Sequence, residues 1–168
     1  GYSQTLQAAI NYAWQKDVVV VAAAGNSATN SLFFPGAANY VAGIAATDIN
    51  NNVASFSNFG NYVALAAPGV GIRSTIPTYP VSLGCCNYGS LSGTSMATPF
   101  VSALAGVIAM TTPNTSAAAI VQRMEQTAAS AAANGVWCCS GTQNGSIGYG
   151  IINAYKAITG SPRLTSTG

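Results

Sequence analysis

The stretch SLSGTSMATP, residues 90–99, holds the residue types from which a nucleophilic site could be built. Ser95 is expected in the first turn of a helix, where backbone N–H groups lack helical partners and the dipole favours negative charge. Such a helix start can stabilise the oxyanion formed when a hydroxyl attacks a carbonyl, and Gly93 would let a substrate come close. The chain has no histidine to activate a serine. Local physics alone therefore favours a plain helix cap, with Thr94 as the capping residue.

Asn26 is a second candidate for the same chemistry. It follows Gly25 and the apolar run of residues 18–22. In open α/β sheets ligands bind at the carboxyl ends of the strands, where an asparagine amide would be a ready N–H donor. An asparagine beside a glycine is also common in turns. On the residues alone both interpretations stay open.

The elements that must position these side chains indicate an α/β fold with a mainly parallel sheet. The run at residues 18–22 is continuously apolar, which predicts a central strand buried on both faces. Residues 77–89 and 134–148 are predicted loops that carry the two cysteine pairs, and the second of them is rich in glycine, serine and asparagine. The expected helices cover residues 3–15, 94–110, 116–127 and 153–158, and the expected strands cover residues 18–22, 40–46, 62–66 and 71–76.

The composition indicates one folding unit over residues 1–168. Hydrophobic residues make up 49% of the chain and charged residues only 5%, which is the reverse of a disordered composition. The net charge is +2, and the lysine and arginine residues form no basic cluster in the sequence. Nucleic acid is therefore not an expected partner. No apolar stretch reaches the roughly 18–20 residues of a membrane span, so no membrane partner is expected either.

The four cysteines form two adjacent pairs, Cys85-Cys86 and Cys138-Cys139. Their spacing does not match a zinc site. Adjacent cysteines bond to each other only with strain, which favours two bridges that link one pair to the other, with free buried thiols as the alternative. Bridges of this kind predict an oxidising, extracellular location.

Six motifs stand out along the chain, namely VVVVAAAGN (18–26), FPG (34–36), ASFSNFG (54–60), AAPG (66–69), SLSGTSMATP (90–99) and GIINAYKAI (150–158). With these motifs in this order, the chain resembles the C-terminal half of the catalytic domain of a subtilisin-like serine peptidase, or subtilase, of the thermitase and proteinase K type. The resemblance extends over nearly the whole chain, and GTSMATP together with AAAGN is highly specific.

The resemblance implies a three-layer subtilisin-like fold, of which this chain forms the C-terminal half, and a role for each matching residue. Ser95 would be the acylating nucleophile. Asn26 and the Ser95 backbone N–H would hold the oxyanion, and the Thr94 hydroxyl would assist. The Phe34–Pro35 bond is expected to be cis. The residues expected to bind substrate are Ala23, Ala24, Gly25, Leu91, Ser92 and Gly93.

In this family the triad aspartate and histidine precede the oxyanion asparagine, so both are expected upstream of Gly1. The implied function is a secreted endopeptidase, completed by an N-terminal segment of the same protease and acting on polypeptides. The alternative is an inert autolysis fragment or a pseudoenzyme module that binds peptides. A lipase on an α/β-hydrolase fold would need G-x-S-x-G, but Ala97 occupies the second glycine position.

The sequence also departs from the family pattern. Phe100 replaces a common histidine outside the triad, and Ala64 replaces an acid that often binds a cation. No cofactor is required. Calcium is expected only as a structural ion, bound mainly by the upstream segment, with a weak carbonyl site at Gly36, Ala38 and Val41. Met96 would be open to oxidation beside the nucleophile.

Overall fold

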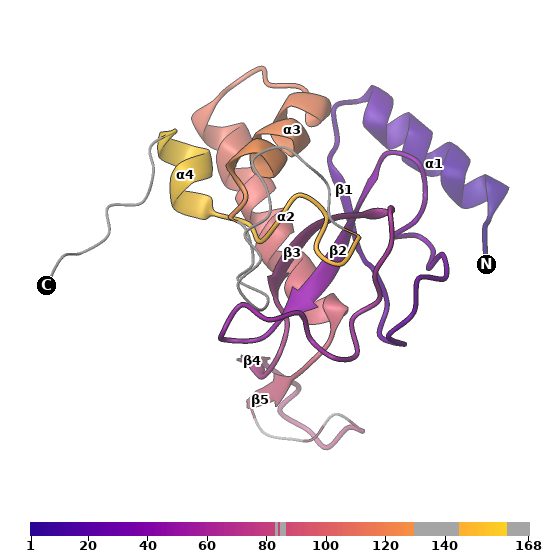
Figure 1. Ribbon diagram of the computed structural model, residues 1–168, viewed down its shortest axis with the longest axis vertical. Coiled ribbons are helices and arrows are strands. Elements are labelled where there is room, and N and C mark those ends of the chain that lie inside the picture. The colour runs from indigo at the N-terminus through magenta and orange to yellow at the C-terminus, as the bar shows by residue number, and fades with distance from the viewer. Residues whose placement is uncertain (83, 85–86, 130–144, 161–168) are drawn as a thin grey trace, which may run out of the picture.

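A computed structural model describes residues 1–82, 84, 87–129 and 145–160. Four helices and five strands occur in these residues (Figure 1). The helices are α1 (Gln4–Gln15), α2 (Thr94–Thr111), α3 (Ala117–Thr127) and α4 (Ala154–Thr159), and the strands are β1 (Val20–Ala23), β2 (Val41–Thr47), β3 (Val63–Pro68), β4 (Ile72–Thr75) and β5 (Tyr88–Leu91).

The main sheet has three parallel strands in the order β1-β2-β3. The α/β class and the parallel sheet are confirmed. The central position predicted for the first strand is wrong for the described residues, because β2 lies in the middle and β1 at an edge. β2 is almost fully buried, whereas the four residues of β1 are half-buried and Val18 before them is 49% exposed. α1 lies beside β1 at this edge (Figure 1).

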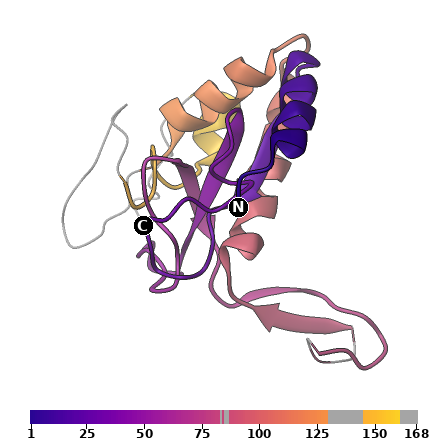
Figure 2. The same cartoon turned by 90° about the vertical axis from the view of Figure 1, so that its right-hand side faces the viewer.

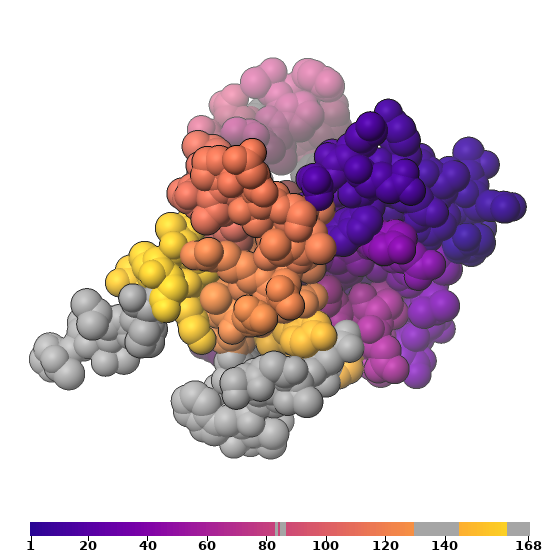
Figure 3. All heavy atoms as spheres, turned by 90° about the horizontal axis from the view of Figure 1, so that it is seen from above, coloured from indigo at the N-terminus to yellow at the C-terminus, as the bar shows by residue number. Residues whose placement is uncertain are grey.

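The core lies on both faces of the sheet. Side chains of β2 alternate, so Ile44 and Ala46 pack with Val101 and Ile108 of α2, while Ala45 faces the other way. The second face is covered by the segment 145–152. α3 and α4 pack against α2, and Figure 3 shows α3 between α4 and α1. The arrangement places the carboxyl ends of the strands at the edge where α2 begins.

The fourth expected strand does form, as β4, but it does not join the main sheet. β4 pairs in antiparallel fashion with β5, and the hairpin projects from the rest of the molecule (Figure 2). The prediction of a loop over 77–89 was therefore wrong at its end, because β5 begins at Tyr88. Tyr88 lies opposite Thr75, and this distant pairing stabilises a short strand with little apolar pattern of its own.

Three of the four helix starts follow the sequence prediction closely. Ser3, Ser116 and Asn153 each accept a hydrogen bond from a backbone N–H in the first turn. α2 is by length and composition long and apolar enough to cross a membrane. It packs along all three strands of the sheet. The expected cis bond between Phe34 and Pro35 is confirmed.

Candidate active site

The start of α2 is organised differently from the sequence expectation. Thr94 is the first helical residue and is completely buried, and the N-cap position belongs to Gly93, which offers no side chain. The prediction of Thr94 as the cap is therefore wrong. The Thr94 backbone N–H donates instead to the Asn26 Oδ1 atom at 2.8 Å. A side chain from the loop after β1 thus caps the helix from outside it.

Asn26 is held by two hydrogen bonds from one residue. The Thr94 hydroxyl also donates to Asn26 Oδ1, again at 2.8 Å. Because a backbone N–H can only donate, the atom of Asn26 that faces Thr94 must be the oxygen. The Nδ2 atom of Asn26 therefore points the other way, with both of its hydrogens available for a further acceptor.

The Asn26 Nδ2 atom and the Ser95 backbone nitrogen both lie close to one point beside Gly93. A Cβ atom built on Gly93 would lie 3.4 Å from Asn26 Nδ2 and 3.7 Å from the Ser95 backbone nitrogen. The same point is 3.6 Å from Met96 Sδ. Asn26 and Ser95 are exposed, so solvent or a ligand reaches this space. Two N–H donors around an open point beside a serine hydroxyl form a site that suits a negatively charged oxygen.

The Thr94 hydroxyl both donates and accepts a hydrogen bond within this site. It donates to Asn26 and accepts from the Gly25 backbone N–H at 3.1 Å. Any assistance from Thr94 therefore acts through the orientation of Asn26. Gly25 is buried with φ at +107°, a conformation that side chains rarely adopt.

The expected substrate wall lies next to these donors. Ala23 ends β1, and Ala24 and Gly25 continue directly toward Asn26. Leu91 ends β5 on the other side of the α2 start, and the exposed Ser92 accepts a hydrogen bond from the Gly71 N–H at 2.9 Å. The structure thus brings the sequence-predicted residues from both segments to one region. Their part in binding substrate stays a prediction.

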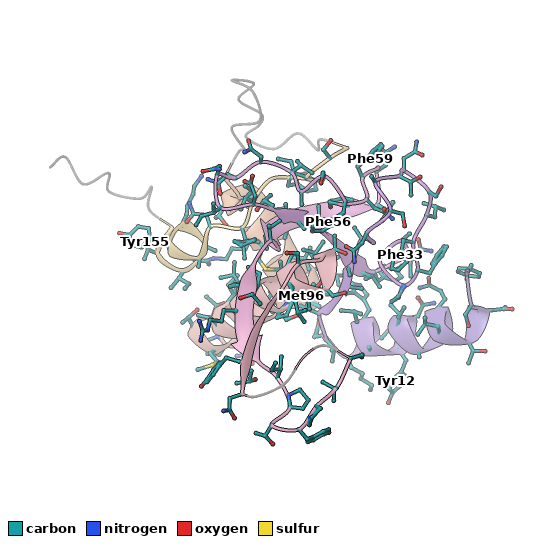
Figure 4. The ribbon with its side chains drawn as sticks, turned by 90° about the horizontal axis from the view of Figure 1, so that it is seen from below. Tyr12, Phe33, Phe56, Phe59, Met96 and Tyr155 are labelled. Carbon is teal, nitrogen blue, oxygen red and sulfur yellow. The ribbon has the colours of Figure 1, made fainter. Side chains whose placement is uncertain are left out.

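Sequence reasoning missed two side chains that pack against this wall. A Cβ on Gly25 would lie 2.4 Å from Asn58 Nδ2 and 2.9 Å from Phe33 Cγ. Figure 4 labels Phe33 on the loop that follows β1 and Phe56 on the loop that follows β2. The motif SFSNFG, residues 55–60, was the available signal, but its residues carry no reactive group and drew no functional interpretation.

A hollow of about 260 Å³ opens between β1 and α2, and a second of about 380 Å³ lies beside Ser95. Both have walls of mainly apolar or small side chains. Phe100 lines the second hollow and is 42% exposed, so the residue that replaces the common histidine contributes apolar surface there. The second hollow is lined by Ile72, Arg73, Ser74, Ser95, Met96, Pro99, Phe100 and Ala103.

None of the carboxylates that the structure describes lies in the hollow beside Ser95. Asp17 accepts a hydrogen bond from the Ala117 N–H, and Asp48 accepts from two N–H groups of its own loop. These bonds hold the pKa of Asp48 below its ordinary value, mainly through the backbone and side chain of Asn52. Burial raises the pKa of Glu125 on α3. None of these three carboxylates is therefore placed to act as a base for Ser95.

The expected cation and disulfide sites stay predictions. No group of three or more histidine, cysteine, aspartate or glutamate side chains gathers within the described ranges. Of the expected carbonyl ligands, Ala38 already accepts the Val41 N–H at 3.3 Å. The Gly36 oxygen faces Gly43, 2.8 Å from where a Cβ would stand. Cys85, Cys86, Cys138 and Cys139 lie outside the described residues.

The fold and the serine site define a class, the subtilisin-like serine peptidases. The chain belongs to the subtilase family, Peptidase S8, whose family model matches residues 1–150. It is similar to thermitase of Thermoactinomyces vulgaris, 42% identical over 153 residues, which cover 91% of this chain and 48% of thermitase. It is also similar to a thermophilic serine proteinase of Bacillus sp. strain AK1, 40% identical over 158 residues, which cover 94% of this chain and 35% of that protein.

Solved structures of subtilisin-like proteases are also similar to this chain. A protease of Pseudoalteromonas arctica PAMC 21717 superimposes with a TM-score of 0.83 at 32% identity, over 95% of this chain and 48% of that one. Fervidolysin of Fervidobacterium pennivorans superimposes with a TM-score of 0.80 at 31% identity, over 98% of this chain and 26% of its own. The chain spans at most about half the length of these relatives.

Proposed function

We propose that the protein is a serine endopeptidase that hydrolyses peptide bonds through an acyl-enzyme on Ser95. The Ser95 Oγ atom bonds to the scissile carbonyl carbon while its proton passes to a histidine. The peptide C–N bond then breaks and the leaving amine takes that proton. Water attacks the ester in the same way, which releases the acid and regenerates Ser95. The carbonyl oxygen, negative in each tetrahedral intermediate, rests between Asn26 Nδ2 and the Ser95 N–H.

The observation that favours this function is the fixed amide of Asn26. Its oxygen accepts two hydrogen bonds from Thr94, so its nitrogen faces the space beside Ser95 before any substrate arrives. Donors that are oriented in advance stabilise developing charge without reorganisation during the reaction. The oxygen of Asn26 caps α2, so the feature that favours catalysis is the amide nitrogen, which lies near the Ser95 backbone N–H.

The activating histidine and its aspartate are proposed to come from a segment of the same protease upstream of Gly1. The chain contains no histidine, and β1 leaves one edge of the sheet without a neighbour among the described strands. The hollow between β1 and α2 is lined by Val19, Val21 and Ala105, which suits a packed apolar segment. The hollow beside Ser95 would receive the histidine.

The remaining functional proposals concern the setting of the enzyme. Polypeptides are the proposed substrates, and their side chains would lie against small, uncharged residues such as Ala23 and Ala24. Secretion is proposed from the paired cysteines. Calcium is proposed only as a structural ion that the upstream segment mainly binds.

Labelling with a fluorophosphonate tests the proposal, because the probe reacts with an activated serine. The protein that contains both this chain and its upstream segment would be labelled, digested and mapped by mass spectrometry. We expect the label on Ser95, no label in Ser95→Ala, and slow labelling in Asn26→Ala. Folded protein that takes no label would contradict the proposal and favour the inert fragment or the peptide-binding pseudoenzyme.

A further inference from the structure

We propose that Asn58 is a positioning residue, which holds the backbone on both sides of Asn26 and so aims its Nδ2 donor. This inference rests on the proposed function of Ser95 and Asn26. Asn58 lies in the loop between β2 and β3, and only 1% of its surface is exposed. It does not contact the space beside Ser95, so its action would pass through Asn26.

The hydrogen bonds of Asn58 span the turn that contains Asn26. Its Oδ1 atom accepts the Ser27 N–H at 2.8 Å and the Thr29 N–H at 3.4 Å. Its Nδ2 atom donates to the Ala24 carbonyl at 3.0 Å. Its own backbone N–H donates to the Gly25 carbonyl at 2.9 Å. Residues on both sides of Asn26 are therefore bound to a single buried side chain and its backbone.

Only an amide of this length satisfies the arrangement. The turn presents N–H groups, which need an acceptor, and a carbonyl, which needs a donor, and the asparagine amide provides both at one end. The absence of a side chain at Gly25 leaves the room, since a Cβ there would lie 2.4 Å from Asn58 Nδ2. The pairing of Gly25 with Asn58 thus shapes the chain directly before the catalytic donor.

Loss of Asn58 would loosen this turn without unfolding it. The Ala24 carbonyl also accepts the Tyr62 hydroxyl at 2.9 Å, and the Ala28 N–H still donates to the Phe56 carbonyl at 2.9 Å. The Asn26 side chain keeps its bonds to Thr94. What changes is the freedom of the backbone that supports it, and misplacement of a catalytic group by about 1 Å costs a large part of its effect.

The test compares Asn58→Ala and Asn58→Ser with a matched control, Ser57→Ala. Ser57 is equally buried, but its hydroxyl accepts the Ala46 N–H in β2 and donates to the Asn58 carbonyl. All variants are made in the protease that contains the upstream segment, with the active fraction counted by fluorophosphonate titration. We expect Asn58→Ala to lower kcat by roughly 10- to 100-fold with KM changed less than about threefold. Asn58→Ser should lose less, and Ser57→Ala should keep kcat.

A double-mutant cycle separates positioning from simple destabilisation. If Asn58 acts through the Asn26 donor, Asn58→Ala should change kcat by less than about twofold in an Asn26→Ala background. An equal loss of kcat in both backgrounds, or the same loss in Ser57→Ala, would overturn the inference. Failure of the wild-type protein to label at Ser95 would instead overturn the proposed function, so the two failures are distinguishable.

Discussion

At the scale of single residues, the Thr94 hydroxyl joins the helix start to Asn26, the proposed oxyanion donor. Thr94→Val keeps the shape of the side chain but removes the bond to Asn26 Oδ1 and the acceptor for the Gly25 N–H. We expect kcat to fall about tenfold, with KM nearly unchanged, because one of two bonds that orient Asn26 is lost. Steady-state kinetics on a peptide substrate measure this effect.

Thr94→Ser is the matched control, since it keeps the hydroxyl and removes only a methyl group. It should stay within about threefold of the wild-type kcat. Equal losses in the valine and serine variants would show that packing, rather than the hydroxyl, is responsible.

A second prediction concerns Gly93. Because glycine has no Cβ atom, the space beside Asn26 Nδ2 stays open. Its backbone is extended, and an alanine Cβ would contact nothing closer than the 3.4 Å to Asn26 Nδ2. Gly93→Ala should therefore fold normally, while its methyl group would fill the space proposed for the oxyanion. We expect kcat/KM to fall by at least about 100-fold. Thermal unfolding should show Tm within about 2 °C of wild type, and a collapse of Tm would refute the explanation.

The residues of the site differ in how far sequence could predict them. Ser95 and Asn26 have chemically informative types at informative places, one in a helix start and one after a strand. Asn58 and Phe33 have no such local signal, because their contacts with Gly25 depend on how separate loops fold together. The error at Thr94 has the same origin, since its cap comes from a distant loop.

At the scale of elements, local signals were reliable and distant partners were not. The starts of α1, α3 and α4 follow their own capping side chains. The apolar run before Asn26 predicted a central strand because such runs are typical of strands with two neighbours. β1 has one neighbour among the described strands, and the proposed upstream segment would supply the other.

The burial of the Glu125 carboxyl on α3 predicts a pH-dependent effect on stability. Burial raises its pKa above the ordinary value of 4.5, so the folded protein binds that proton more tightly than the unfolded chain. Below pH 4.5 the protonated Glu125 carboxyl makes its whole contribution to the free energy of unfolding. This contribution is lost as the pH rises through the pKa of the folded protein. Glu125→Gln should thus raise Tm at pH 7 and leave it unchanged near pH 3.5. The side chain is only half-buried, so the gain should stay under about 1 kcal/mol, or roughly 2–4 °C.

Thermal unfolding at the two pH values measures this difference. The matched control is Gln126→Ala on the exposed side of the same helix, whose effect should be equal at both pH values. A Glu125→Gln effect of the same size at pH 3.5 and pH 7 would contradict the assignment to carboxylate burial.

At the scale of the whole molecule, the open edge of the sheet predicts uneven protection of the backbone. Among the described strands, β2 lies between two neighbours, whereas β1 has a neighbour on one side only and is half-buried. In the chain of residues 1–168 alone, amides of β1 should exchange with deuterium at least about tenfold faster than those of β2. With the upstream segment present, this difference should disappear. Equal protection of β1 in both samples would argue against a strand that docks there.

The bond between Asn26 and Thr94 joins residues 68 positions apart in the chain. A turn of helix around Ser95 needs only its neighbours in sequence, but closing a loop of this length needs most of the domain to assemble. We therefore expect the turn around Ser95 to form before the Asn26 side chain is oriented. Under the proposed function, a newly made or partly unfolded chain would hold a serine whose oxyanion donor is not yet oriented, and self-digestion would be delayed until the domain has assembled.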